Sequence, residues 1–406
     1  MWIPILVSLL ILVVSSIYML FNREEGEEKE IKPGPFIGGL ANDGNTCFIN
    51  SIIQSLASST AFTDFLNQHD KTFIKTLNKL LSELNVHREK SKLFSTKPLL
   101  KVMNDSPSRH LFFGYNQEDA QEFYQNLMKQ IESEVKEKDE KEEEDEKERK
   151  KTPLNLVTPV DGIQTEEIKC TNCGESSGKR NTVVSGLSLS IPKGTRHTFD
   201  LNELLDEFVK PELIDGVECN RCTLTYVKDS LESNLQNIDN EKLSLKIRER
   251  IDEISKVLRE NTIPDDVFQK FSTTNMVKHV TKAKSTFISK PPPLLCIHIN
   301  RSVYDPARGM VRKNSSKINF PIKLDLSEYM APDSNEDSSY TLKSVVSHWG
   351  THNYGHYTCH RWHNDNWYAI SDDEVSLCTE ENVLKSDGTY MLFYELPNKS
   401  ILHPNL

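Results

Sequence analysis

The sequence predicts an α+β protein, in which a helical N-terminal part is followed by a part built mostly of strands. Apolar residues recur at helical spacing between residues 47 and 132, most clearly over 66–84. Residues 163–225 and the chain from 275 onward instead alternate as strands do, and residues 187–192 have a clean period of two. With 406 residues, 37% of them hydrophobic, the chain is long enough for one large or two ordinary domains.

The first predicted element is an uncharged apolar run over residues 2–21. At about 1.5 Å per residue, a helix of this length reaches roughly 30 Å, the thickness of a bilayer core. Trp2 and Tyr18 are placed to act as interface anchors. The alternative is a cleaved signal peptide, but the run is too long and lacks a basic start. We therefore expect a transmembrane anchor over 1–21 and a mobile charged linker over 22–35.

Two further segments are distinguished by their charge and by the spacing of their apolar residues. The formal net charge of −11 argues against a nucleic-acid partner. Residues 134–151 form a dense mixed-charge run with no apolar residue after Val135. This run is either a solvated helix or disordered, and we expect a disordered charged insertion over 134–152. Residues 240–258 are different, because their apolar residues recur at the spacing of an amphipathic helix.

Cys47 is the most informative residue of the chain. It follows a Gly- and Asn-rich turn and begins a helical pattern, and the free N–H groups of a helix N-terminus favour thiolate over thiol. His356 stands far downstream in a Gly-His-Tyr context, with polar residues after it. An early Cys and a late His with an orienting group are the chain order of a papain-like cysteine peptidase. A lone Cys is more often a buried core residue, but Asn42, which could donate to an oxyanion, favours catalysis here.

Four segments, in order, resemble the ubiquitin-specific protease family over residues 38 to 395. They are a Cys box at 40–56, a Gln- and Asp-rich box at 114–123, a Pro-rich strand at 291–301 and a His box at 345–375. The resemblance implies a papain-like catalytic domain over 36–396 with a helical thumb, a β-rich palm and zinc-tied β fingers. The implied boundaries are a thumb at about 36–132, fingers at about 163–290 with a helical insertion at 229–265, a palm at about 291–396 and a tail at 397–406.

The resemblance also implies catalytic roles. Cys47 is the nucleophile that attacks the carbonyl joining the C-terminal glycine of ubiquitin to a lysine amine, and His356 is the base that protonates the leaving amine. His352 and His360 are nearby alternatives without the Gly-His-Tyr context. Asn42 donates to the oxyanion together with the N–H of Cys47; its alternative role is an Asx turn.

The third catalytic residue departs from the family pattern. The family has Asp or Asn four residues after the strand tryptophan, whereas here Trp367 places Ser371 at that position. The mitochondrial outer-membrane type of the family has the same departure. A hydroxyl can accept a hydrogen bond from the imidazole but carries no charge to stabilise the imidazolium. Asp372 is the alternative orienting residue, or assists the oxyanion site.

Four residues are expected to bind the substrate. Asp119 and Glu122 match family positions that grip the two arginines of the ubiquitin tail, and carboxylates form strong hydrogen bonds with arginine. From periodicity alone, these two acids could also be a solvated helix face. Gly355 leaves room for the narrow Gly-Gly tail, and Tyr357 follows the catalytic histidine.

Two Cys-x-x-Cys pairs, separated by 45 residues, predict a metal site: Cys170, Cys173, Cys219 and Cys222. Four thiolates suit a tetrahedral, structural Zn²⁺ site without an open position. Disulfides would instead require an oxidising compartment. The resemblance places this zinc at the tips of the fingers that hold the globular part of ubiquitin, and implies no cofactor for catalysis.

The functional expectation is a membrane-anchored, thiol-dependent deubiquitinase with a cytosolic catalytic domain. Its partners would be ubiquitin and ubiquitinated membrane proteins at an organelle surface, with the mitochondrial outer membrane favoured and the endoplasmic reticulum as the alternative. Two other classes stay open. One is a catalytically weak ubiquitin-binding scaffold, and the other is a peptidase for another ubiquitin-like modifier.

Overall fold

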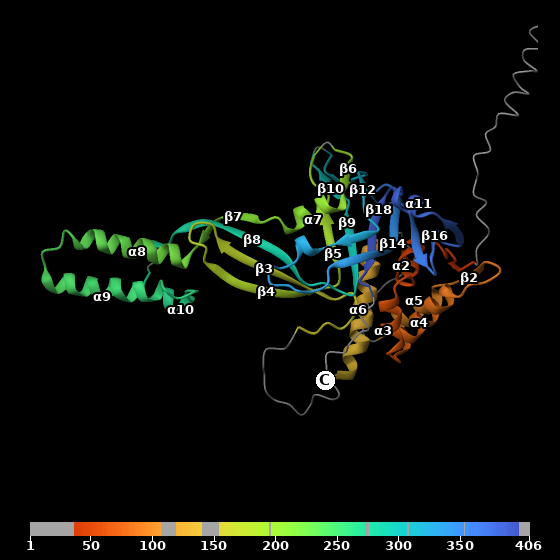
Figure 1. The fold of residues 1–406 in the computed structure, drawn as a ribbon, viewed down its shortest axis with the longest axis horizontal. Coiled ribbons are helices and arrows are strands. Elements are labelled where there is room, and N and C mark those ends of the chain that lie inside the picture. The colour runs from red at the N-terminus through yellow and green to blue at the C-terminus, as the bar shows by residue number, and fades with distance from the viewer. Residues whose placement is uncertain are drawn as a thin grey trace, which may run out of the picture.

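The computed structural model describes residues 36–106, 119–139, 154–194, 196–272, 276–306, 308–352 and 354–397. A helical part packs against a large sheet, and a narrow β ribbon carries a helical arm away from this body (Figure 1). The predicted α+β class is therefore confirmed. The expected anchor over 1–21, the linker over 22–35 and residues 398–406 of the tail lie outside the described residues. Within the described part, no helix has the length and apolar character needed to cross a membrane.

The helical part follows the stripe of apolar residues that the sequence shows. Its elements are β1 (Gly38–Leu40), α2 (Cys47–Leu56), α3 (Thr60–Asn67), α4 (Thr72–Asn85), β2 (Lys92–Phe94), α5 (Lys97–Asp105) and α6 (Ala120–Asp139). All ten residues of α2 are buried, because this helix lies between α4 and α6 on one side and the large sheet on the other. The N-terminus of α2 is thus fixed at the junction of the two parts.

Helix α6 runs further than the sequence suggested. Residues 134–139, expected as the start of a disordered insertion, continue the helix. Its Val135 still packs on the helical core, and an ion pair between Lys136 and Glu132 at 2.5 Å links successive turns. Residues 140–153 of the expected insertion lie outside the described residues.

The large sheet has eight strands in the order β17-β16-β15-β14-β18-β9-β5, with β13 paired to β14. These are β5 (Leu187–Ser190), β9 (Leu294–Asn300), β13 (Lys323–Asp325), β14 (Ser339–Gly350), β15 (Gly355–His363), β16 (Asn366–Ser371), β17 (Glu374–Cys378) and β18 (Thr389–Glu395). Strand β18 is buried on both faces. Met391 and Phe393 join the core of the helical part, whereas Leu392 and Tyr394 join a second core on the opposite face.

Two details correct the sequence-based expectations for residues 163–225. Strand β5 lies in the range expected for the fingers, but pairs in parallel with β9 of the large sheet. The segment also holds helix α7 (Leu201–Val209), which follows β6 (Thr198–Asp200) and covers the second core with η2 (Ser327–Tyr329). A capping box between Asp200 and Glu203 starts α7 and interrupts the strand pattern.

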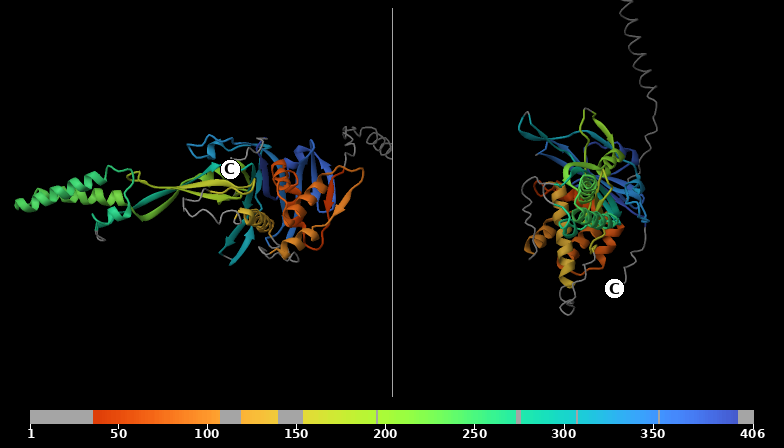
Figure 2. Two further views of the ribbon diagram at one scale, coloured as in Figure 1. Left: turned by 90° about the horizontal axis from the view of Figure 1, so that it is seen from below. Right: turned by 90° about the vertical axis from the view of Figure 1, so that its left-hand side faces the viewer.

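The ribbon is a four-stranded antiparallel sheet in the order β4-β3-β8-β7. It consists of β3 (Gly162–Cys170), β4 (Ser176–Val184), β7 (Glu212–Glu218) and β8 (His279–Lys290), and carries the arm α8 (Asn220–Leu235), α9 (Glu241–Val257) and α10 (Asp265–Phe268). The left view of Figure 2 shows again that the arm lies at the far end of the ribbon. The amphipathic helix predicted over 240–258 is confirmed as α9, but the helical segment begins already at Asn220 rather than at 229.

Most of the short elements next to the large sheet were not predicted. They are the hairpin of β10 (Ser302–Asp305) and β11 (Met310–Lys313), the strand β12 (Lys317–Asn319) beside β6, and the helix α11 (Glu380–Leu384). Of these, only β12 coincides with a predicted strand, at 317–320. The β10–β11 hairpin lies beside the hairpin of β14 and β15, to which it is hydrogen-bonded.

Candidate active site

Cys47 is the first residue of α2, as the sequence predicted. The turn before it places Gly44 at φ +94° and Asn45 at φ +57°, and both residue types tolerate this left-handed backbone. The residue is 3% exposed, and the backbone N–H of Tyr357 acts to lower the pKa of its thiol. The peptide unit after His356 therefore lies near the nucleophile.

The protonation state of Cys47 differs from the expectation. Burial raises the pKa of the thiol, and the charge of Asp372 raises it further, whereas hydrogen bonds from backbone N–H groups, Tyr357 first, lower it. The net shift is upward, so the helix N-terminus does not by itself hold a thiolate here. A base that takes the thiol proton would therefore promote reaction of this sulfur.

His356 lies at the start of β15 and its Nε2 is 2.9 Å from the hydroxyl oxygen of Ser371, the last residue of the neighbouring strand β16. With the proton on Nε2, Ser371 accepts it, and Nδ1 keeps a lone pair that can take the thiol proton. The alternative histidines lie elsewhere: His352 contacts the Ser302 hydroxyl at 3.0 Å, and His360 is paired with Val345 and Ala369 inside the sheet.

Asp372 points to a different partner from Ser371. Its φ of +54° turns the chain after β16, and its nearly buried carboxylate accepts from Asn42 Nδ2 at 2.8 Å and from Asn50 Nδ2 at 2.7 Å. Of the two residues considered for orienting His356, the structure places Ser371 at the imidazole and Asp372 at the amides beside α2. Asn50 was not predicted, since an Asn inside a helical pattern carries no distinguishing signal.

The contacts of Asn42 include a local turn contact and leave one N–H for the oxyanion role that was expected of it. Its Oδ1 accepts from the backbone N–H of Thr46 at 3.1 Å, which closes an Asx-type turn. Its Nδ2 donates one proton to Asp372, which fixes the plane of the amide. An amide has two N–H groups, so the second can be donated to an oxyanion beside Cys47.

The expected tail-binding acids lie at the N-terminus of α6. Asp119 accepts from the backbone N–H groups of Gln121 and Glu122 at 2.8 and 3.2 Å, and from the hydroxyl of Tyr390. Glu122 is exposed in the first turn. A pocket of about 130 Å³ opens beside Asp119. It is lined by Asp119, His298, Arg301, Ser302, Lys313, His348, His352, Tyr357 and Tyr390.

The structure gives Gly355 and Tyr357 packing roles that the sequence did not suggest. A Cβ atom at Gly355 would lie 2.0 Å from the carbonyl oxygen of Trp349 and 2.3 Å from Nε2 of His348. The close pairing of β14 and β15 therefore requires glycine at this position. The ring of Tyr357 stacks on His348 with a centroid distance of 4.4 Å, which places Tyr357 between Cys47 and the pocket.

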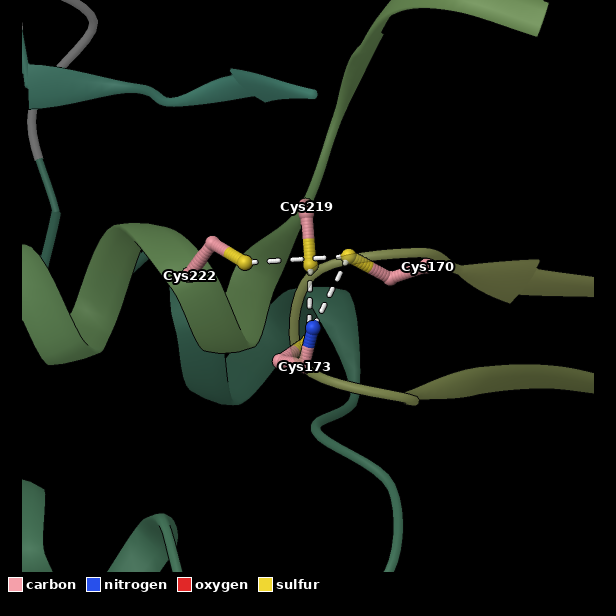
Figure 3. A group of neighbouring side chains, drawn as sticks. All are labelled: Cys170, Cys173, Cys219 and Cys222. Atoms are coloured by element: carbon pink, nitrogen blue, oxygen red, sulfur yellow. Dashed lines mark hydrogen bonds between the residues drawn. The ribbon is translucent and has the colours of Figure 1, made fainter. Parts of the chain in front are cut away.

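The four predicted metal ligands converge where the ribbon meets the arm (Figure 3). Cys170 and Cys173 come from the end of β3, and Cys219 and Cys222 from the start of α8. All four sulfurs lie within 4.8 Å of one another; Cys173 is 3.5 Å from Cys219, and Cys170 is 3.7 Å from Cys222. Tetrahedral Zn²⁺ with Zn–S bonds of about 2.3 Å separates its sulfurs by about 3.8 Å, so the donor set fits zinc. All eight cysteines are free thiols.

Glu175 supports this cluster and was missed by the sequence interpretation. Its nearly buried carboxylate accepts from the backbone N–H groups of Arg221 at 3.1 Å and Ile263 at 3.2 Å, and from the Cys219 thiol at 3.6 Å. The Arg221 guanidinium donates in turn to the carbonyl of Leu258 at 2.6 Å. These contacts join the β3–β4 turn to all parts of the arm.

A helix-borne thiol and a strand-borne histidine with a hydroxyl partner, meeting between a helical and a β-rich part, define a papain-like cysteine peptidase. Comparison with known families identifies the type. Residues 38–394 match the family model described as "Ubiquitin carboxyl-terminal hydrolase". The chain belongs to this family.

Individual relatives agree with this assignment. The chain is 35% identical to "Ubiquitin carboxyl-terminal hydrolase 1" of Saccharomyces cerevisiae, over 76% of this chain and 52% of that protein. It is 24% identical to "Ubiquitin carboxyl-terminal hydrolase 30" of Xenopus tropicalis, over 96% of this chain and 86% of that protein. The chain thus spans only about half the length of the yeast relative.

A solved structure, "Structure of the SAGA Ubp8/Sgf11/Sus1/Sgf73 DUB module bound to ubiquitin aldehyde", has the same fold. The TM-score is 0.61 at 22% identity, and the match covers 95% of this chain and 76% of that chain. At this identity the likeness concerns the fold.

Proposed function

We propose that this chain is a thiol-dependent deubiquitinase, which cleaves the isopeptide bond after the C-terminal glycine of ubiquitin. The observation that carries the proposal is the His356–Ser371 pair, next to Tyr357, whose N–H lowers the pKa of Cys47, in a member of the ubiquitin carboxyl-terminal hydrolase family. The relatives are named ubiquitin carboxyl-terminal hydrolases, and one related structure has ubiquitin aldehyde bound.

The residues divide the reaction between them as follows. Nδ1 of His356 takes the thiol proton, and the thiolate attacks the carbonyl carbon of the terminal glycine. The oxyanion accepts from the free Nδ2–H of Asn42 and from the N–H of Cys47. His356 then gives its proton to the lysine amine, which leaves, and water hydrolyses the thioester. Ser371 keeps the imidazole in the required tautomer throughout.

The surface around the site suits a protein substrate. Five large apolar side chains of the two adjacent hairpins are exposed: Tyr304, Met310, Val311, Trp349 and Tyr354. Exposed apolar groups gathered next to a reactive centre mark a protein-binding surface. Asp119, in the wall of the neighbouring pocket, and Glu122, exposed in the first turn of α6, would bind the arginines of the tail.

Zinc belongs to the proposal as a structural ion. Cys170, Cys173, Cys219 and Cys222 would hold it with four thiolates, which leaves no position for water or substrate. Its role would be to fix the end of the ribbon and the arm, and the catalytic step uses protein groups alone.

Membrane attachment is also proposed. Its support is the uncharged run over residues 2–21, which has the length and composition of a membrane-spanning helix. The mitochondrial outer membrane is favoured over the endoplasmic reticulum, and the substrates would be ubiquitinated proteins on that surface. Carbonate extraction of cells that express the full chain tests this. The full chain should remain in the membrane pellet, whereas a chain without residues 1–35 should be released.

The decisive experiment is reaction of the full chain, in detergent, with ubiquitin that carries a C-terminal electrophile. Wild type should form a covalent adduct, and Cys47→Ala should not. One competing function is a ubiquitin-binding scaffold that does not cleave. Wild-type protein that binds ubiquitin without forming the adduct would establish that function instead. Adduct formation only with a probe built on another ubiquitin-like modifier would show that the chain acts on that modifier and not on ubiquitin.

A further inference from the structure

Lys313 is a half-buried lysine in the wall of the pocket beside the active site. It ends β11, and its Nζ donates to the carbonyl oxygen of His348 at 2.7 Å and to that of Gly350 at 3.2 Å. Both acceptors belong to the end of β14. The residue between them, Trp349, is paired with His356 in the ladder of β14 and β15.

The body of the protein holds the β11 end of this contact in place. Arg301 precedes β10, is 3% exposed, and donates to the carbonyls of Asn314 and Ser316 at 2.9 and 2.7 Å. It also donates to the carbonyl of Thr389 in β18 at 2.8 Å. The base of the β10–β11 hairpin is therefore attached to the central strand of the large sheet.

Holding an ammonium at this place costs free energy. Burial, with the positive charge of Arg301, lowers the pKa of Lys313 to about 8. The ammonium is stabilised mainly by backbone carbonyl dipoles. These dipoles fix its position but do not cancel its charge. A cation kept beside a reaction centre under these conditions indicates a functional requirement.

We propose that Lys313 is a positioning residue for His356: its ammonium fixes the end of β14, and the paired strand β15 transmits this position to the imidazole. The inference rests on the proposed function, in which His356 is the base. A second contact, between Ser302 and His352, also links the β10–β11 hairpin to the end of the β14–β15 hairpin. Lys313 thus acts through the backbone and touches no reacting atom.

The test compares Lys313→Met, which keeps the aliphatic stem, with Lys313→Arg, which keeps a cationic donor. Lys323→Met, on the exposed strand β13, is the matched control. With the full chain and a fluorogenic ubiquitin C-terminal amide, Lys313→Met should lower kcat about 10- to 100-fold, because small misplacements of a catalytic group cost this much. KM and the melting temperature should change little, and Lys313→Arg should recover most of kcat.

Two results would overturn the inference: wild-type kcat in Lys313→Met, or a loss of kcat that only follows a loss of folded protein. A third measurement separates this inference from the proposed function. Alkylation of Cys47 by iodoacetamide across pH reports the coupling of thiol and imidazole without ubiquitin. Lys313→Met should shift this profile in the same direction as His356→Ala, even if wild type cleaves no ubiquitin derivative. An unshifted profile would rule out the positioning role.

Discussion

At the scale of single residues, Ser371 and Asp372 are consecutive but serve two different groups. Ser371 orients the imidazole of His356, while Asp372 holds the amides of Asn42 and Asn50. The left-handed φ of Asp372 causes this separation, because it turns the carboxylate away from β15. The negative charge of Asp372 is therefore hydrogen-bonded to the two amides, whereas the partner of His356 is an uncharged hydroxyl.

The role of Ser371 leads to the first prediction. Ser371→Ala should lower kcat/KM about 10- to 100-fold, since loss of the orienting partner removes part of the contribution of general-base catalysis. Ser371→Asp should retain or raise activity, because a carboxylate also stabilises the imidazolium. Ser376→Ala, on the exposed edge of β17, is the control. Equal activity of Ser371→Ala and the control would exclude the role.

A double-mutant cycle tests the contact between Asn42 and Asp372. Asn42→Ala should lose about 10²–10³ in kcat, the usual effect of removing one oxyanion donor. Asp372→Ala should lose less, and the double variant should be no worse than Asn42→Ala, because both changes remove the same oriented N–H. Steady-state kinetics on the fluorogenic amide measure this. Additive losses would mean that Asp372 acts independently of Asn42.

The types of the site residues could be inferred from the sequence, but their contacts could not. Cys47, His356 and Ser371 follow from family motifs and from the spacing after Trp367. The separation of Ser371 from Asp372 depends on one backbone dihedral, which residue order does not encode. The raised pKa of Cys47 depends on its burial by segments hundreds of residues downstream.

At the scale of elements, the cysteine cluster lies where the ribbon joins the arm. The tips of β3 and β4 meet the first turn of α8 through the four sulfurs, through Asn172, which donates to the Cys222 sulfur, and through the contacts of Glu175 and Arg221. The small core of the arm, formed by α8, α9 and α10, shares no apolar cluster with the body. A metal held by the four cysteines would therefore take the place of a hydrophobic interface at this junction.

Removal of the metal gives the third prediction. Cys222→Ser should bind less than one equivalent of zinc, melt at a lower temperature and bind ubiquitin more weakly. Cys47 alkylation should stay at the wild-type rate, since the site lies in the body of the molecule. Cys378→Ser, a cysteine outside the cluster, is the control. Metal content by mass spectrometry and calorimetry provide the measurements, and full zinc content in Cys222→Ser would contradict the assignment.

Elements long enough to show several repeats of the helical or strand pattern were predictable, whereas short elements were not. Helix α9 and strands such as β14 and β18 agree with their sequence patterns. The strands β10 and β11 span four residues each, too few for alternation to be recognised. The alternation of β5 was read correctly, but a pattern of buried and exposed residues does not reveal which sheet a strand joins.

At the scale of the whole molecule, buried histidines link folding to pH. Burial lowers the pKa values of His298, His348 and His363 to about 4. In the unfolded chain a histidine has a pKa of about 6.5. The folded pKa is the lower one, so this stabilisation is present above pH 6.5 and is lost as the pH falls towards 4.

The fourth prediction follows from the downward direction of these pKa shifts. The urea midpoint of the full chain in detergent should fall between pH 6.5 and pH 4.5. His363→Gln should reduce the slope, because glutamine can still donate to the carbonyl of Asn85 but takes up no proton. His197→Gln, at an exposed histidine, should leave the slope unchanged. A midpoint that is flat over this range in wild type would show that the three histidines do not control acid stability.

The ribbon and arm also determine how the molecule moves through solution. A body with a long, thin extension has a larger frictional coefficient than a sphere of the same 46.6 kDa mass (Figure 2). A single copy will therefore sediment slowly and leave a sizing column early, at the volume of a heavier globular protein. Early elution is thus the expected behaviour of one chain, and only a mass measured by light scattering can distinguish it from a pair.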